Sequence, residues 1–170
     1  MPAENQKQHH SKVSAGLLMY RFNGNTLEIF LGHPGGPFFA KKNEGAWSIP
    51  KGEVNLDEGL LQTALREFEE ETGIKPTGEY LSLGHIKQKN GKIVHAWAFT
   101  GDCDNNKPIR SNTFTMEWPP HSGQKQEFPE IDQGAFFDSE TAKQKINPAQ
   151  AALIERLQAL LEHKSKPVGE

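Results

Sequence analysis

GEVNLDEGLLQTALREFEEETGI (residues 52–74) is the stretch on which the interpretation of the whole chain depends. Its second half has the periodicity of a helix. Apolar residues recur at the spacing of one helix face, at Leu60, Leu61, Ala64, Leu65 and Phe68. We therefore expect an amphipathic helix whose apolar side packs on the core.

Local signals mark both ends of this helix. Asp57 is expected to be the N-cap, because a short polar side chain there accepts a hydrogen bond from the first turn. Gly73 is expected to end the helix in the left-handed conformation. The preceding residues, WSIPKG at 47–52, indicate a short buried strand followed by a turn.

The polar side of the helix carries a cluster of carboxylates. Glu67, Glu70 and Glu71 are spaced i, i+3 and i+4, so they stack on one face and repel each other by a few tenths of a kcal/mol per pair. Such a cluster points to a bound cation, and Mg2+ prefers oxygen ligands and bridges carboxylates to phosphates. Backbone carbonyl groups at Lys51 and Gly52 are expected to face the same ion.

The fixed positions of this stretch resemble the signature of the Nudix hydrolases (the MutT-like family), GX5EX7REUXEEXGU, in which U is aliphatic or aromatic. The matching residues are Gly52, Glu58, Arg66, Glu67, Phe68, Glu70, Glu71, Gly73 and Ile74. The resemblance implies an α/β fold, a Nudix-type α/β/α sandwich with a mixed β-sheet. It also implies a Mg2+-dependent hydrolase, with Mn2+ as a substitute, that uses Glu67, Glu70 and Glu71 as metal ligands together with a carbonyl of Lys51 or Gly52.

Other motif residues have supporting roles in this interpretation. Arg66 is permanently charged and is expected to hold the neighbouring carboxylates, and Glu58 either pairs with it or bonds loop backbone. The family draws one more acidic residue from outside the motif, as base or metal ligand. Glu127 and Glu130 both fit, and we prefer Glu127. The motif positions expected to be structural are Gly52, Glu58 and Gly73.

The resemblance implies cleavage of a phosphoanhydride bond in a nucleoside diphosphate linked to another moiety. Two marks of family subgroups are absent. Lys89 stands where ADP-ribose hydrolases have proline, and residues 90–92 lack the tyrosine associated with diadenosine polyphosphates. By elimination we expect a nucleoside triphosphate, cleaved to the monophosphate and pyrophosphate. The alternatives are a dinucleoside polyphosphate of the diadenosine tetraphosphate type and a non-catalytic nucleotide-binding Nudix module.

Residues outside the motif are candidates for substrate contacts. The candidates for phosphate oxygens are Arg21, His33, Lys41, Lys42 and Lys51. Phe39 or Phe38, together with Trp118, is a candidate platform for a base. The alternatives are a surface charge for Arg21, loop anchoring for the phenylalanines and core packing for Trp118.

Length, charge and cysteine content limit the domain organisation and the kinds of partner that the chain can have. The 170 residues suffice for one domain, expected at 13–164 between polar tails at 1–12 and 165–170. The net charge of −3 argues against a general nucleic-acid-binding surface. A single cysteine excludes an intrachain disulfide, and neither a signal peptide nor a membrane span is recognisable. We expect a cytoplasmic monomer or homodimer with a small-molecule nucleotide substrate.

Alternation and turn signals predict the remaining elements. An Asn-Gly turn at 23–25 indicates a hairpin, residues 32–45 and 119–134 are expected to be loops, and Asn147-Pro148 is expected to open a C-terminal helix. The expected strands are 13–22, 27–31, 80–88, 92–100, 112–118 and 135–137.

Overall fold

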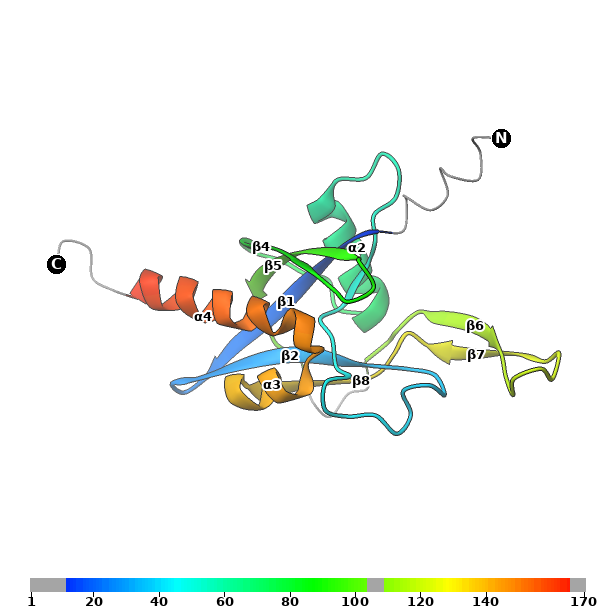
Figure 1. Cartoon of the computed structure of the whole chain (residues 1–170). Helices are drawn as coiled ribbons and strands as arrows, with labels where there is room; N and C mark the ends of the chain where they lie inside the picture. Colours follow the sequence, from blue (N-terminus) through cyan, green and yellow to red (C-terminus); the bar gives the residue numbers. More distant parts are fainter. Residues whose placement is uncertain (1–11, 104–108, 166–170) are drawn as a thin grey trace.

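The computed structural model of the chain describes residues 12–103 and 109–165 (Figure 1). Apart from Lys12 and Ser165, the predicted tails lie outside these ranges. The strands are β1 (Val13–Asn23), β2 (Thr26–Pro34), β3 (Lys51–Glu53), β4 (Leu81–Lys87), β5 (Ile93–Thr100), β6 (Thr113–Glu117), β7 (Lys125–Pro129) and β8 (Ile131–Asp138). The helices are α2 (Leu60–Thr72), α3 (Ser139–Lys145), the 3-10 turn η1 (Pro148–Gln150) and α4 (Ala151–Ser165).

The main sheet has the order β4-β5-β1-β2-β8, with β3 added to β1. The β1–β5 pair is parallel and the others are antiparallel, so the sheet is mixed, as predicted. One edge of β1 is shared by two partners. Residues 14–16 pair with β3 and residues 20–23 pair with β2, which brings the start of the 52–74 stretch against the middle of the sheet.

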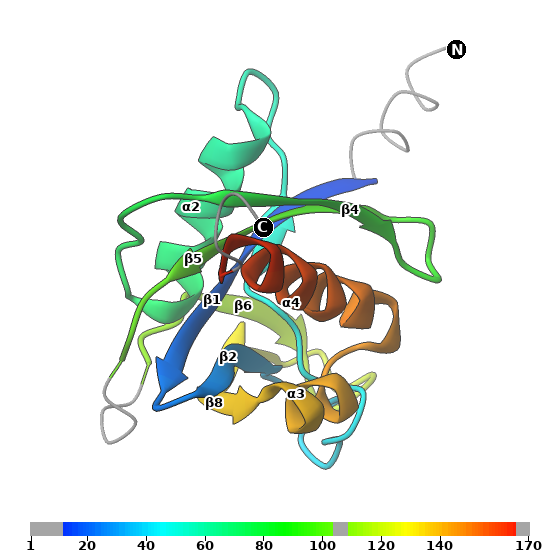
Figure 2. The ribbon, with the colours of Figure 1, turned by 90° about the vertical axis from the view of Figure 1, so that its left-hand side faces the viewer.

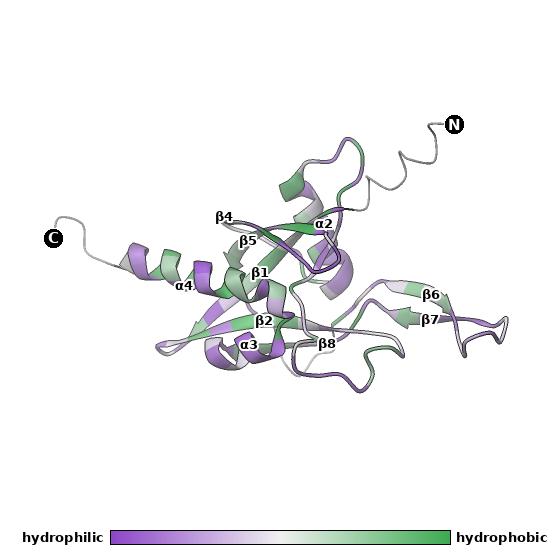
Figure 3. Ribbon diagram, viewed as in Figure 1, coloured by the Kyte–Doolittle hydropathy of each residue, from purple (hydrophilic) through white to green (hydrophobic). Residues whose placement is uncertain are grey.

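Helices cover both faces of the sheet, which gives the expected α/β/α sandwich (Figure 2). Helix α2 lies on one face, where Phe68 and Ala64 pack with Phe30 and Phe99. Helices α3 and α4 lie on the other face and bury a second cluster that includes Leu157. In Figure 3 the last turns of α2 are hydrophilic, whereas the strands between the helices are largely hydrophobic. None of the helices in the described ranges is long and apolar enough to cross a bilayer.

Helix α2 begins two residues later than an Asp57 cap would place it. Gly59 is the N-cap, and its N–H donates to Gln62 Oε1 at 3.0 Å, whereas Asp57 has a positive φ of 66° in the preceding loop. The prediction of Asp57 as N-cap is therefore wrong. The predicted end is confirmed, because Gly73 has φ 77° and its N–H donates to the Glu69 carbonyl at 2.8 Å.

The predicted loop at 119–134 is mostly strand. Residues 125–129 form β7, which pairs with β6, and β8 extends over 131–138 rather than 135–137. We call residues 113–129 the β6–β7 arm, because this hairpin forms a separate two-stranded sheet that projects from the main body (Figure 1). The start of β7 has no apolar alternation, since residues 125–127 are exposed on both faces. Helix α3 was also missed, because Ala142 alone is buried within its seven residues.

Candidate active site

The glutamate face of α2 lies against β3, and two close approaches fix it there. At Gly52 an added Cβ would overlap the Glu67 carboxyl group, so the absence of a side chain allows the helix to come this near. The Lys51 N–H donates to Glu71 Oε2 at 3.0 Å. A similar approach occurs at Gly16, where a Cβ would lie 2.7 Å from Lys51 Cβ. Strands β1 and β3 therefore set the position of both glutamates.

Arg66 joins three carboxylates. Its Nε and Nη2 donate to the two oxygens of Glu58 at 2.8 and 3.0 Å, which is a bidentate pair. Its Nη1 donates to Glu67 Oε1 at 2.9 Å and to Glu70 Oε2 at 3.2 Å. The Arg66 bonds, with a further one from Thr63, lower the pKa of Glu58 to about 2, and the same pair raises the pKa of Arg66. The guanidinium thus orients the motif carboxylates from the side.

Burial raises the pKa of the carboxyl groups in the interior of the site. Glu71 is 8% exposed, and burial first and the nearby Glu67 second raise its pKa to about 8. Burial also raises the pKa of Glu67 and, from outside the motif, that of Glu130. Burial lowers the pKa of Lys51, which lies among these groups. The site therefore places several carboxyl groups where water stabilises their ionised forms poorly.

Glu130 reaches this cluster through a chain of backbone hydrogen bonds. The Asn112 N–H donates to the Glu70 carbonyl at 2.8 Å, and the Glu130 N–H donates to the Asn112 carbonyl at 2.9 Å. The Glu130 carbonyl then accepts from the Gly35 N–H at 3.0 Å. The end of α2, the base of the β6–β7 arm and the end of β2 are thus tied together around Glu130.

These groups line a cavity of about 190 Å3, which we call the glutamate pocket. Lys51, Glu71 and Glu130 supply its charged groups. The remaining walls come from Gly32, Pro34, Ser48, Ile49 and Ile131. The pocket is too small for a whole nucleotide, and its chemistry suits a phosphate group with the cations that neutralise it.

No three His, Cys, Asp or Glu side chains among residues 12–103 and 109–165 converge as a metal-binding group. Arg66 draws Glu67 and Glu70 to one side, while Glu71 is held by the Lys51 amide. The donor set nevertheless fits a hard cation. Carboxylates that burial and mutual repulsion keep from ionising are the groups that a divalent ion stabilises, and their oxygens are the ligands that Mg2+ prefers.

The predicted base or metal ligand Glu127 and the predicted phosphate contact Arg21 both lie away from the glutamate pocket. Glu127 is exposed on β7, opposite Thr115, and does not line the pocket. The Arg21 guanidinium bonds Glu28 at 2.7 Å and Asp102 at 2.6 Å and stacks over Phe136. Neither residue is brought to the motif glutamates.

The remaining predicted contacts are spread over two other places. His33, Lys41 and Lys42 line a separate cavity that does not include the motif glutamates. Phe38 is 65% exposed, and its ring centroid lies 6.2 Å from that of Trp118 in an edge-on arrangement. Phe39 lies beside Lys42, 5.5 Å from its ammonium group. Of the substrate candidates, only Lys51 lies in the glutamate pocket.

Sequence reasoning missed one supporting residue. Gln150 is fully buried, accepts from the Ile49 N–H at 3.1 Å and donates to Ser48 Oγ at 3.0 Å. It thereby fixes the segment that leads into Lys51. Its only sequence signal is a polar residue within the apolar start of the C-terminal helix, which is too weak to distinguish it from a surface position.

Comparisons with known proteins agree with this geometry. A family model described as NUDIX domain matches residues 10–157. Over 56 residues the chain is 39% identical to a CTP pyrophosphohydrolase of Escherichia coli (strain K12), covering 32% of this chain and 41% of that protein. Over 57 residues it is 40% identical to an asymmetrical bis(5'-nucleosyl)-tetraphosphatase of Rattus norvegicus, covering 30% of this chain and 39% of that protein.

The fold has counterparts among solved structures. A binary complex of a C. elegans Ap4A hydrolase superposes with a TM-score of 0.64 at 20% identity, covering 88% of this chain and 98% of the other. At this identity the likeness shows the fold alone. The matches to the two curated relatives span only about two fifths of their lengths.

Proposed function

The chain belongs to the NUDIX domain family, and from this premise we propose that it is a Mg2+-dependent pyrophosphohydrolase whose reaction takes place in the glutamate pocket. The bond cleaved is a phosphoanhydride of a nucleoside diphosphate linked to another moiety. The observation that carries the proposal is the group of carboxylates formed by the buried Glu71 and the half-buried Glu67 and Glu130, with Lys51 beside it.

Three motif glutamates are the proposed metal ligands. Glu67 and Glu71 face β3. Glu70 directly precedes Glu71 in the helix and accepts a hydrogen bond from Arg66. A carbonyl of Lys51 or Gly52 completes the donor set in this proposal. Mg2+, or Mn2+ in its place, supplies Lewis-acid stabilisation of phosphate charge when bound.

The protein's own groups supply positioning and proton transfer. The Lys51 side chain lines the pocket and offers a positive charge to a phosphate oxygen. Glu130 is the proposed general base in preference to Glu127, because Glu130 lines the pocket and burial raises its pKa toward the working range of a base. Arg66 acts through Glu67 and Glu70 and is a positioning residue.

We propose a nucleoside triphosphate as substrate, cleaved to the monophosphate and pyrophosphate. Support comes from the likeness to a CTP pyrophosphohydrolase over 56 residues. The second candidate is a dinucleoside polyphosphate, favoured by the similar match to a tetraphosphatase over 57 residues. The cellular setting in this proposal is the cytoplasm, with the chain acting as a monomer or homodimer.

A phosphate-release screen of the full chain tests the proposal. The panel contains the NTPs and dNTPs, diadenosine polyphosphates, ADP-ribose and nucleotide sugars, each with Mg2+ and with EDTA, and products are separated by charge. The expected result is Mg2+-dependent release of pyrophosphate and a monophosphate from one NTP. Hydrolysis of diadenosine tetraphosphate alone would replace the first candidate with the second.

Absence of hydrolysis from folded protein would instead favour a nucleotide-binding module.

A matched pair of variants tests the assignment of the base. Glu130→Gln is expected to lower kcat by at least 10²-fold and to flatten its pH dependence, whereas Glu127→Gln is expected to leave both unchanged.

A further inference from the structure

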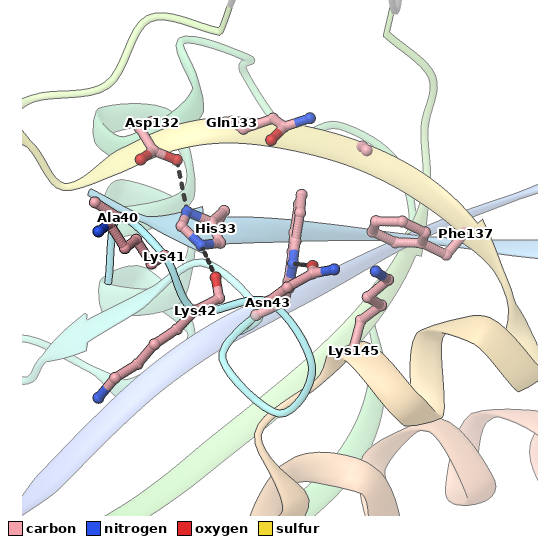
Figure 4. Close-up of a pocket in the computed structure, with 11 residues that line it drawn as sticks. His33, Ala40, Lys41, Lys42, Asn43, Asp132, Gln133, Phe137 and Lys145 are labelled. Atoms are coloured by element: carbon pink, nitrogen blue, oxygen red, sulfur yellow. Dashed lines mark hydrogen bonds and ion pairs between the residues drawn. The ribbon is translucent and has the colours of Figure 1, made fainter. Parts of the chain in front are cut away.

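A second cavity, of about 790 Å3, is lined by residues of β2, the loop after it, β8 and the end of α3 (Figure 4). His33 is paired with Gln133 in this register, and paired residues of antiparallel strands point to the same side. None of the residues that line this cavity also lines the glutamate pocket. We call this space the lysine cavity.

Hydrogen bonds hold its walls in place. His33 Nδ1 lies 2.8 Å from Asp132 Oδ1, and His33 Nε2 lies 2.6 Å from the Lys42 carbonyl, as Figure 4 shows. Trp47 Nε1 donates to Asn43 Oδ1 at 2.9 Å. These bonds tie the loop at 40–43 to the sheet, so the cavity is formed in advance and a ligand need not order it.

Unpaired cations set the charge of this cavity. Lys41, Lys42 and Lys145 line it, and within the described ranges no carboxylate lies within ion-pair distance of any of the three. Its one carboxylate, Asp132, is engaged by His33. Figure 4 shows the Lys145 side chain near Phe137, whereas the Lys42 side chain extends away from both, so the lysines surround the cavity and do not converge in it. A concave surface surrounded by lysines, in a chain of net charge −3, attracts an anion.

Neutral groups between the lysines suit a planar ring. The Phe137 ring is half-buried, and the Lys145 ammonium lies 6.0 Å from its centroid. The amide of Gln133 is exposed at the cavity wall, and no side-chain hydrogen bond engages it in the described part of the chain. A ring face beside an amide and several cations is the chemistry that recognises a base with its phosphate.

We propose that the lysine cavity binds a nucleoside phosphate, with the phosphate on the lysines and the base against Phe137 and Gln133. The volume lies within the ~300–1,000 Å3 typical of small-molecule sites. Two ligands share this chemistry: the second nucleoside of a dinucleoside substrate and a separate nucleotide. The site is distinct from the glutamate pocket, and its occupancy does not require the proposed hydrolase activity.

Calorimetric titration of the full chain with AMP in the presence of EDTA tests the proposal. We expect saturable binding at one site, with adenosine and inorganic phosphate each at least about tenfold weaker, because each carries half of the recognised chemistry. Absence of saturable binding at millimolar AMP would overturn the proposal. Equal affinity for AMP and inorganic phosphate would overturn the assignment to a nucleoside.

Variants locate the binding. Lys145→Met and Gln133→Glu are each expected to weaken AMP binding about tenfold. Lys143→Met is the control, because Lys143 lies on the same helix but pairs with Glu140 and does not line the cavity. Lys51→Met is expected to leave AMP binding unchanged. Loss of binding in Lys51→Met with retention in Lys145→Met would place AMP in the glutamate pocket and contradict the proposal.

Steady-state kinetics of Lys145→Met then distinguish the two ligands, and either result supports binding at the cavity once the titration has shown it. A raised KM for diadenosine tetraphosphate at unchanged kcat identifies the second nucleoside of the substrate. An unchanged KM identifies a separate nucleotide. Because AMP binding is measured without Mg2+ or turnover, failure of the hydrolase proposal and failure of this one are separate outcomes.

Discussion

Glu71 is the residue at which burial and neighbouring charge act together most strongly. In the metal-free folded protein its pKa is about 8, whereas in the unfolded chain it is near the ordinary value of 4.5. Between these two values the folded state binds more protons than the unfolded state. The free energy of unfolding should therefore fall as pH rises from about 5 to 8.

Urea unfolding in EDTA at pH 5, 6.5 and 8 measures this dependence. Glu71→Gln is expected to remove a large part of the slope, because glutamine cannot ionise and its Oε1 can still accept from the Lys51 amide. Glu67 and Glu130 contribute in the same direction, since burial raises the pKa of each, whereas the lowered pKa of His95 contributes in the opposite direction. An unchanged slope in Glu71→Gln would show that this carboxyl is not protonated in the folded state.

Arg66 donates hydrogen bonds to three carboxylates through its planar guanidinium group, and the single ammonium group of a lysine cannot reproduce this geometry. In Arg66→Lys, Glu58 loses a bidentate partner, and Glu67 and Glu70 lose their common donor. We predict at least a tenfold loss in kcat and a higher Mg2+ concentration for half-maximal rate. The control is Arg156→Lys, because Arg156 donates only to carbonyls of β4. Wild-type Mg2+ dependence in Arg66→Lys would contradict the positioning role.

The spacing of the motif predicts which side chains of α2 share a face, but it does not predict which residue a distant segment brings to the site. Arg66 does hold Glu67 and Glu70, and Glu71 does face β3, because a helix fixes which residues share a face. Glu130 could not be chosen over Glu127 from sequence. Its place depends on backbone bonds through Asn112, which lies far away in the chain.

The packing of α2 on β3 depends on a glycine. In Gly52→Ala the added Cβ would overlap the Glu67 carboxyl group, so either the helix or the carboxylate must move. We predict at least a tenfold loss of kcat and a lower thermal midpoint. Gly59→Ala is the matched control, because a Cβ there meets only the end of Gln62, at 3.4 Å. Equal activity of the two variants would contradict the close approach.

Gln150 links η1 to the segment that enters β3. In Gln150→Leu the buried Ile49 N–H loses its acceptor, and Ser48 Oγ loses a donor while it keeps its own bond to the Ile49 carbonyl. An unsatisfied buried donor costs about 1–3 kcal/mol, and urea unfolding should show a loss of this size. The control is Gln158→Leu on α4, a half-buried position without a side-chain hydrogen bond in the described ranges. Equal stability of the two variants would contradict the bridging role.

Element prediction succeeded where a local signal decides the structure. Gly73 ends α2, and Asn147 caps η1 through a bond from the Ala149 N–H. Prediction of the elements failed where pairing between segments, and not local sequence, determines the structure. Strand β7 exists because β6 lies beside it, and its first half has no apolar pattern of its own. Asp57 looked like a cap, but the loop before α2 gives it a positive φ.

In the molecule as a whole, Trp118 lies toward the far end of the arm, away from the glutamates. Trp118 pairs with Gln124, six residues before Glu130 along an extended strand, which corresponds to about 20 Å. Only a long substrate with its reacting phosphates in the glutamate pocket spans this distance. Trp118→Ala should therefore leave KM for a nucleoside triphosphate unchanged and raise it for a dinucleoside polyphosphate. A raised KM for the triphosphate would contradict this placement.

The arrangement of the sheet was only partly predictable. Residues alternate along β5 with both faces covered, as expected of a central strand. The division of one β1 edge between β2 and β3 was not predictable, because the β1–β3 pairing joins residues more than thirty positions apart. That division brings Lys51 and Gly52 to the glutamates.

The proposed function requires that Glu67, Glu70 and Glu71 form a metal-dependent hydrolytic centre. The most direct test is the kcat of Glu71→Gln on the preferred panel substrate at saturating Mg2+, with circular dichroism to show that the variant is folded. We predict a loss of at least 10²-fold, the size expected when electrostatic stabilisation of a transition state is removed. Wild-type turnover in folded Glu71→Gln would contradict the account.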